Sequence, residues 1–131
     1  MSYLLDTNAV IALMEVRQPL FNRVRRLAPA NFHLSAIVTH ELYFGAYNGR
    51  RTNETLDRLD GLRFEILDFD LEDARRSAEI RAVLARNGTP IGPYDVFIAG
   101  QALNRGLTLI TRNTREFSRV AGLVVEDWEG A

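Results

Sequence analysis

The sequence predicts an α/β fold in which a mostly parallel sheet is covered by helices on both faces. Short apolar runs alternate along the chain with segments of helical periodicity, and strands separated by helices pair in parallel. The 131 residues, 47% of them hydrophobic, are enough for one domain with a real core, and no repeat or linker-like stretch divides them. We therefore expect a single domain over residues 1–131.

The predicted elements begin and end at residues with known local preferences. The Ser35 hydroxyl can cap a helix, Asp70 and Asp73 resemble a capping box, Pro93 suits a first helical turn, and Gly106 suits a helix end. Strands are expected at residues 3–5, 32–34, 64–67, 107–110 and 123–125. Helices are expected to end near residues 14, 27, 48, 62, 87 and 105.

Composition excludes several mechanisms. The chain has no cysteine, and all 16 of its basic residues are arginine. Disulfides, thiolate metal sites and reactions that need a Cys or Lys side chain are therefore excluded. No apolar run reaches the roughly 18–20 residues of a membrane helix and no secretory pattern opens the chain, so we expect a cytoplasmic protein with no membrane partner. The net charge of −1 provides no global attraction for nucleic acid.

Two aspartates stand where charge is unexpected. Asp6 directly follows an apolar strand and precedes a helix, and ligands of open α/β sheets bind at the carboxyl ends of strands. Asp95 lies three and four residues before Ile98 and Ala99, which places it on the apolar stripe of its helix. Alternatively, Asp6 is a helix cap and Asp95 a first-turn acid that favours the helix dipole.

Glu41 is the third candidate, because it shares a helical stripe with Ile37 and Gly45. A solvated helix face is the alternative interpretation. Three carboxylates that point inward from different segments repel one another unless a cation lies between them. Oxygen ligands without Cys suit Mg²⁺ or Mn²⁺ rather than Zn²⁺, and His33 and His40 are interpreted as structural or surface residues.

The order of these motifs resembles the PIN-domain family and, within it, the VapC-type toxins of toxin–antitoxin pairs. The matching features are an apolar strand before Asp6-Thr7-Asn8, Leu34-Ser35, Glu41-Leu42 with Gly45, Pro90-Ile91-Gly92-Pro93-Tyr94-Asp95, Thr111-Arg112-Asn113 with Phe117, and Val124-Val125 to Trp128. The resemblance implies a PIN-like three-layer sandwich and an endoribonuclease that uses Mg²⁺ or Mn²⁺. It also implies a homodimer and a cognate antitoxin that covers the acidic groove.

The resemblance assigns the acidic ligand positions to Asp6, Glu41 and Asp95. The fourth family position is commonly Asp and here is Asn113, whose amide oxygen can coordinate a cation but supplies no charge. Glu116 is a candidate to act there through a water. Thr7, Ser35 and Thr111 are the supporting polar residues of this prediction, and helix capping is an equal alternative for Thr7 and Ser35.

Substrate and partner contacts are assigned to two further groups. Arg112 and Arg115 beside the fourth motif are predicted to bind RNA phosphates, although a solvated arginine face is the ordinary alternative. Tyr43, Phe44 and Tyr47 are interpreted first as core residues and otherwise as a dimer or antitoxin surface.

Three other functions compete with the nuclease prediction. A haloacid-dehalogenase-like phosphatase would want a second Asp where this chain has Asn8, and both it and a receiver domain use a Lys that is missing. The stronger alternative is a catalytically weak PIN-like module that binds RNA or a partner. Metal-dependent RNA cleavage separates that module from the enzyme.

Overall fold

Five parallel strands form the central sheet of the protein, whose computed structural model describes residues 1–130. The strands are β1 (Tyr3–Leu5), β2 (Phe32–Ser35), β3 (Glu65–Leu67), β4 (Thr108–Ile110) and β5 (Val125–Glu126). Their order in the sheet is β3-β2-β1-β4-β5, and every neighbouring pair is parallel. The predicted α/β class with a parallel sheet is confirmed.

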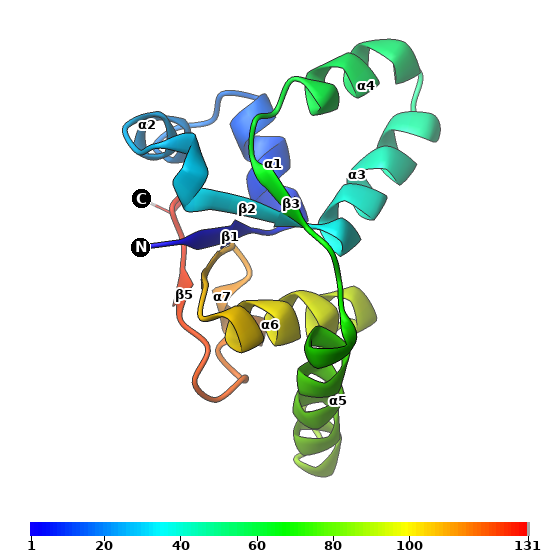
Figure 1. Ribbon diagram of the computed structural model, residues 1–131, viewed down its shortest axis with the longest axis vertical. Coiled ribbons are helices and arrows are strands. Elements are labelled where there is room, and N and C mark those ends of the chain that lie inside the picture. Colours follow the sequence, from blue (N-terminus) through cyan, green and yellow to red (C-terminus); the bar gives the residue numbers. More distant parts are fainter. Residues whose placement is uncertain (131) are drawn as a thin grey trace.

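Helices cover both faces of this sheet (Figure 1). One layer holds α1 (Thr7–Met14), α2 (Leu20–Arg25), α3 (Ala36–Tyr47) and α4 (Thr52–Asp60), and the other holds α5 (Leu71–Arg86), α6 (Pro93–Arg105) and α7 (Thr114–Phe117). A 3₁₀ turn at Pro29–Asn31 leads into β2. Within residues 1–130, each helix is too short or too polar to span a lipid bilayer.

Local capping sets the helix boundaries as predicted. Ser35 accepts the backbone N–H of Ile37 at 3.1 Å, and Asp70 and Asp73 exchange bonds of 2.9 and 3.0 Å in a full capping box. Gly106 ends α6 with a φ of 67°, a conformation that favours glycine. These local hydrogen bonds fix where α3, α5 and α6 begin or end.

The last strand lies further along the chain than predicted. β5 occupies Val125–Glu126 rather than residues 123–125, and Thr111 donates its backbone N–H to the Glu126 carbonyl at 3.0 Å. Trp128 follows β5 and is buried against the rings of Tyr3 and Phe32. The C-terminal segment therefore completes the core beside β1 and β2.

A buried polar network joins α5 to α6. The Asp73 carboxylate is fully buried and accepts hydrogen bonds from Arg105 at 2.9 Å, Asn104 at 2.9 Å and Gln101 at 3.0 Å. Burial raises the pKa of Asp73, but these bonds and the Asp70 N–H outweigh it and hold the pKa at about 2. The carboxylate is thus a charged centre that ties the two helices together.

Candidate active site

Asp6 leaves the carboxyl end of β1 and turns its carboxylate into the protein. The side chain is 6% exposed, accepts the Ala9 N–H at 2.8 Å, and accepts the hydroxyl of Thr111 beyond β4. Burial is the main cause of its raised pKa; the bonds from Thr111 and Ala9 oppose this rise, and the charges of Glu129 and Glu41 add to it. Asp6 is therefore both the cap of α1 and a buried carboxylate near other acids.

Asp95 approaches from the first turn of α6. Its carboxylate is half-buried. One carboxylate oxygen lies close to Gly92, and a Cβ added to that glycine would be 3.3 Å from this oxygen. Burial, followed by the charges of Glu116, Asp6 and Glu41, raises the pKa of Asp95 to about 6. The fold thus brings the predicted acidic side chains into one electrostatic cluster.

Glu41 is held by the first residue of α1. The Thr7 hydroxyl donates a hydrogen bond of 3.0 Å to the Glu41 carboxylate, which links α1 to α3 across 34 positions of sequence. Thr7 therefore has a role in orienting Glu41, beyond the helix-end role that was the alternative. Ser35 is fully buried and caps α3, which is the structural role considered for it.

The fourth motif joins Asn113 to Glu116, which lies three residues further along the chain. The backbone N–H of Asn113 donates a hydrogen bond to the Thr111 hydroxyl oxygen at 3.0 Å. The side-chain amide of Asn113 donates to the Glu116 carboxylate at 3.0 Å. Since the charge of Glu116 is the strongest of those acting on Asp95, Glu116 supplies the fourth negative charge. Glu129, which the sequence analysis did not single out, adds its charge near Asp6.

The chemistry of this cluster fits a hard divalent cation. Within residues 1–130, Asp6, Glu41, Asp95 and Glu116 make no salt bridge, so their mutual repulsion has no cationic compensation from the protein. No three Asp, Glu or His side chains of that range form a ready group that could hold a metal ion, so the predicted three-carboxylate ligand set is not preformed. Mg²⁺ keeps several waters and usually needs only one or two carboxylates, so these residues still fit it.

Comparison with known proteins gives the family. A model of the PIN domain matches residues 3–123. The chain belongs to the PIN-domain family. It is 38% identical over 130 residues to the tRNA(fMet)-specific endonuclease VapC of Salmonella typhimurium, with 98% of each chain covered.

Solved structures agree with this family. The DNA-bound VapBC structure from Salmonella typhimurium contains a chain that matches with a TM-score of 0.92 at 38% identity, covering 98% of both chains. VapBC2 from Rickettsia felis, bound to a DNA fragment from its promoter, matches with a TM-score of 0.91 at 32% identity, covering 98% of this chain and 99% of that one. This PIN domain is therefore of the VapC type, as the motifs predicted.

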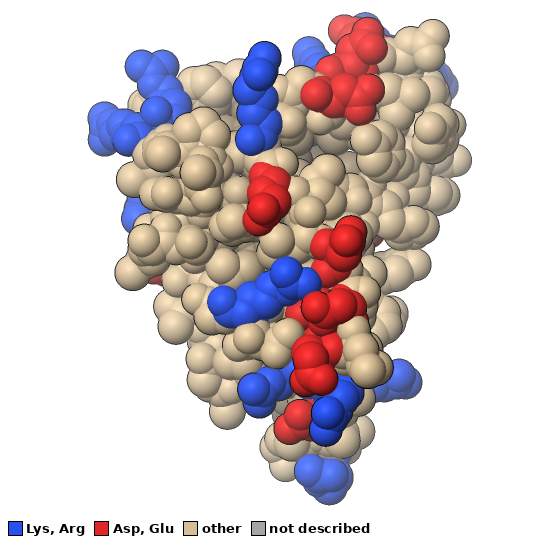
Figure 2. All heavy atoms as spheres, in the orientation of Figure 1, with Lys and Arg blue, Asp and Glu red and all other residues tan. Residues whose placement is uncertain are grey.

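The predicted RNA-binding arginines of this PIN domain are exposed. Arg112 and Arg115 have no ion-pair partner among residues 1–130, so their role in phosphate binding stays a prediction. Figure 2 shows a row of acidic side chains where β3 and the start of α5 lie in Figure 1. Exposed acids of these segments are Glu65, Asp68, Asp70 and Glu72. Asp70 pairs with Arg105 at 3.5 Å and Glu72 with Arg75 at 3.6 Å, so the charge of this row is partly neutralised.

The aromatic residues of α3 are mostly not core residues. Phe44 is 63% exposed and Tyr47 is 67% exposed, so the first interpretation was wrong for both. Tyr43 is half-buried, and its hydroxyl donates to Asp60 at 3.2 Å. Two large apolar side chains of this PIN domain are therefore available for contact with another molecule.

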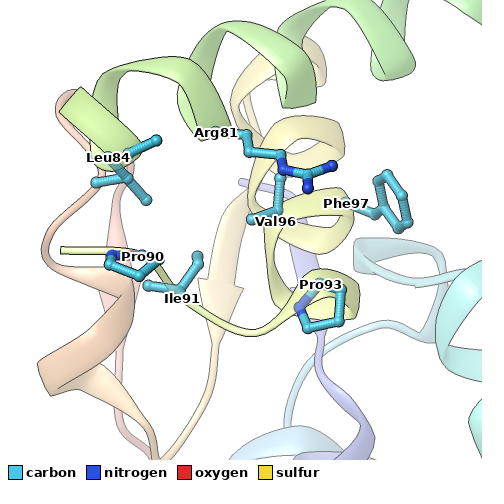
Figure 3. Close-up of a pocket in the computed structure, with 8 residues that line it drawn as sticks. Arg81, Leu84, Pro90, Ile91, Pro93, Val96 and Phe97 are labelled. Atoms are coloured by element: carbon cyan, nitrogen blue, oxygen red, sulfur yellow. The ribbon is translucent and has the colours of Figure 1, made fainter. Parts of the chain in front are cut away.

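A cavity between α5 and α6 lies outside the acidic cluster. It has a volume of about 330 Å³ and is lined by Arg81, Leu84, Ala85, Pro90, Ile91, Pro93, Val96 and Phe97 (Figure 3). None of the four clustered carboxylates lines it. We therefore assign the chemistry to the acidic cluster and not to this cavity.

The raised pKa of Asp95 predicts a pH-dependent stability for the metal-free domain. The folded protein binds this proton more tightly than the unfolded chain, whose aspartate titrates near 3.8. Asp95 therefore lowers the free energy of unfolding as the pH rises from about 4 to about 6. We expect Asp95→Asn to remove this pH-dependent loss of stability. In EDTA at pH 7, the variant should therefore melt at a higher temperature than wild type.

Thermal unfolding followed by circular dichroism across this pH range checks the prediction. Glu79→Gln, which removes an exposed acid of α5, is the matched control and should keep the wild-type profile. Parallel profiles for wild type and Asp95→Asn would contradict it.

Proposed function

We propose that this PIN domain is an endoribonuclease that hydrolyses RNA phosphodiester bonds with the help of Mg²⁺ or Mn²⁺, and that it is the toxin of a toxin–antitoxin pair. The observation that carries the proposal is the convergence of Asp6, Glu41, Asp95 and Glu116 from four separate segments without a compensating cation. Uncompensated carboxylates are costly and are typical of functional sites. The VapC names of its relatives agree with this activity.

The side chains divide the work at the site. Asp6, Glu41 and Asp95 would hold the cation, which when bound lowers the pKa of the attacking water and stabilises charge on the phosphate. The Ala9 N–H and the Thr111 hydroxyl fix the Asp6 carboxylate, and the Thr7 hydroxyl fixes that of Glu41. Water is the nucleophile, so no covalent residue is needed, and we propose 5′-phosphate and 3′-hydroxyl products.

Substrate and partners follow from the relatives. We propose transfer RNA as the substrate, since the Salmonella relative is described as specific for tRNA(fMet). We propose a VapB-type antitoxin as the partner, a homodimer as the assembly and the cytoplasm as the place of action. Exposed Phe44 and Tyr47 provide apolar area for a protein contact.

Chelation is the direct test of the metal-dependent activity. We expect partner-free protein to cut total bacterial RNA into discrete fragments with Mg²⁺ or Mn²⁺. It should lose this activity in excess EDTA, because without a cation the pKa of the attacking water is not lowered. Fragments are resolved on denaturing gels and their ends are sequenced. Activity that survives EDTA would contradict the mechanism, and folded protein that cuts no RNA with either metal would favour the binding module.

A further inference from the structure

A second cavity begins at the acidic cluster itself. It has a volume of about 350 Å³ and lies between α1, α3 and α4, which share one face of the sheet. Its lining includes Thr7 and Glu41, the pair joined by a 3.0 Å hydrogen bond. Along α1 the lining continues through Ile11 and Met14 to Glu15, about 12 Å from Thr7. The cavity therefore leads from the catalytic carboxylates toward the far end of α1.

Gly45 forms part of the wall and has no packing reason to be glycine. A Cβ added there would meet nothing within 4 Å, whereas one added at Gly100 would meet Ser77 Oγ at 2.0 Å. A glycine inside a helix costs up to about 1 kcal/mol relative to alanine. The close contact of α6 with α5 explains why residue 100 is a glycine. No such contact explains the glycine at position 45, which lines the same cavity as Glu41. The open space at Gly45 leaves room for a ligand to approach α3 closely.

The polar groups of the cavity match the edges of a nucleobase. Leu42, Ala46 and Leu59 add apolar wall, on which the flat faces of a base can lie. The Arg58 guanidinium makes no hydrogen bond or ion pair with residues 1–130, and Glu15 is paired only with Arg17 at the surface. Arginine donates to O6 and N7 of guanine, and a carboxylate accepts from its amino group. The site thus offers both kinds of partner that guanine requires.

We propose that this cavity binds the base of a nucleotide one or two positions from the scissile phosphate and that it prefers guanine. Thr7 and Glu41 belong to the cavity lining and Glu41 also belongs to the acidic cluster, so an RNA strand whose phosphate lies at the cluster can place a neighbouring base further along the cavity, toward Arg58 and Glu15. At about 350 Å³ the cavity is near the lower limit for ligand pockets, a size for one nucleoside. This inference rests on the proposed nuclease function and adds a base preference to it.

Binding of two fluorescein-labelled RNAs in EDTA tests the proposal without cleavage. One probe is oligouridine and the other is the same oligouridine with one central guanosine, and binding is followed by fluorescence anisotropy. We expect wild type to bind the guanosine probe about tenfold more tightly. Gly45→Leu, which fills the cavity from an open position, should remove this preference, and Ala78→Leu on the exposed face of α5 should keep it.

Arg58→Gln keeps the test decisive should Gly45→Leu fail to fold, because it removes the guanidinium without filling the cavity. Its preference for the guanosine probe should also fall severalfold. Equal discrimination by wild type and both variants would overturn the proposal, as would loss of antitoxin binding by Gly45→Leu with RNA discrimination unchanged.

Metal-dependent cleavage of total RNA by the same wild-type preparation separates the two proposals. Cleavage without any guanine preference overturns the cavity assignment alone. Absence of both cleavage and RNA binding overturns it together with the nuclease function.

Discussion

Asp6→Asn should reduce RNA cleavage about a thousandfold while leaving the protein folded. Asparagine keeps the shape of the side chain and can still accept the Ala9 N–H, so the cap of α1 survives. What the substitution removes is the negative charge of the most deeply buried carboxylate of the cluster. Initial rates of fragment formation in Mn²⁺, with melting temperatures measured in parallel, check the expected loss.

Asp57→Asn is the matched control for this experiment. Asp57 is exposed on α4, makes no ion pair within residues 1–130, and undergoes the same chemical change away from the acidic cluster. Its cleavage rate should equal that of wild type. If Asp6→Asn retained a rate within about twofold of wild type, Asp6 would have no part in the reaction.

Asp73→Ala should lower the free energy of unfolding by about 3–5 kcal/mol, because it leaves the Arg105 guanidinium without its buried partner. The change also removes the acceptor of the Asn104 and Gln101 amides and half of the capping box of α5. Urea unfolding followed by tryptophan fluorescence measures the loss.

Glu72→Ala, one residue away on α5, is the matched control, because it removes an exposed carboxylate instead of a buried one. Glu72 is exposed and pairs only with Arg75 at 3.6 Å, so its removal should cost less than about 1 kcal/mol. Similar costs for the two substitutions would contradict the structural role given to the buried network.

Features that depend on neighbouring residues were predictable from the sequence. The Ser35 cap, the Asp70 box, the Pro93 start and the Gly106 end of helices each rest on contacts within a few residues. The two residues of β5 depend instead on pairing with β4, and the four residues of α7 are too few to show a period. Those elements were misplaced or missed because nothing local specifies them.

The site was predictable to the extent that its charges interrupt apolar patterns. Asp6 after a strand and Asp95 on an apolar stripe stand out in this way. Glu116 does not, and the prediction named it only as a supporting residue beside Asn113. Only the folded chain shows that the Asn113 amide donates to Glu116, and that Glu129 lies near Asp6. The buried partners of Asp73 were missed for the same reason, since they lie on another helix.

The aromatic residues of α3 show the limit of a general preference. Aromatic side chains are mostly buried, yet Phe44 and Tyr47 are exposed on α3. Composition cannot reveal that, because exposure depends on how far a helix extends past the layer beneath it. In Figure 1, α3 runs outward from the sheet toward α4.

The hydrogen bonds that join distant parts of the chain at the acidic cluster have a consequence for the synthesis of this PIN domain. Asp6 leaves the ribosome 105 positions before Thr111, whose hydroxyl holds its carboxylate in the folded chain. Thr111 is in turn paired with Glu126, and the adjoining core is closed by Trp128. A nascent chain whose residues 111–128 are still inside the exit tunnel therefore carries Asp6 without these supports, so the acidic cluster is completed only after that segment has emerged.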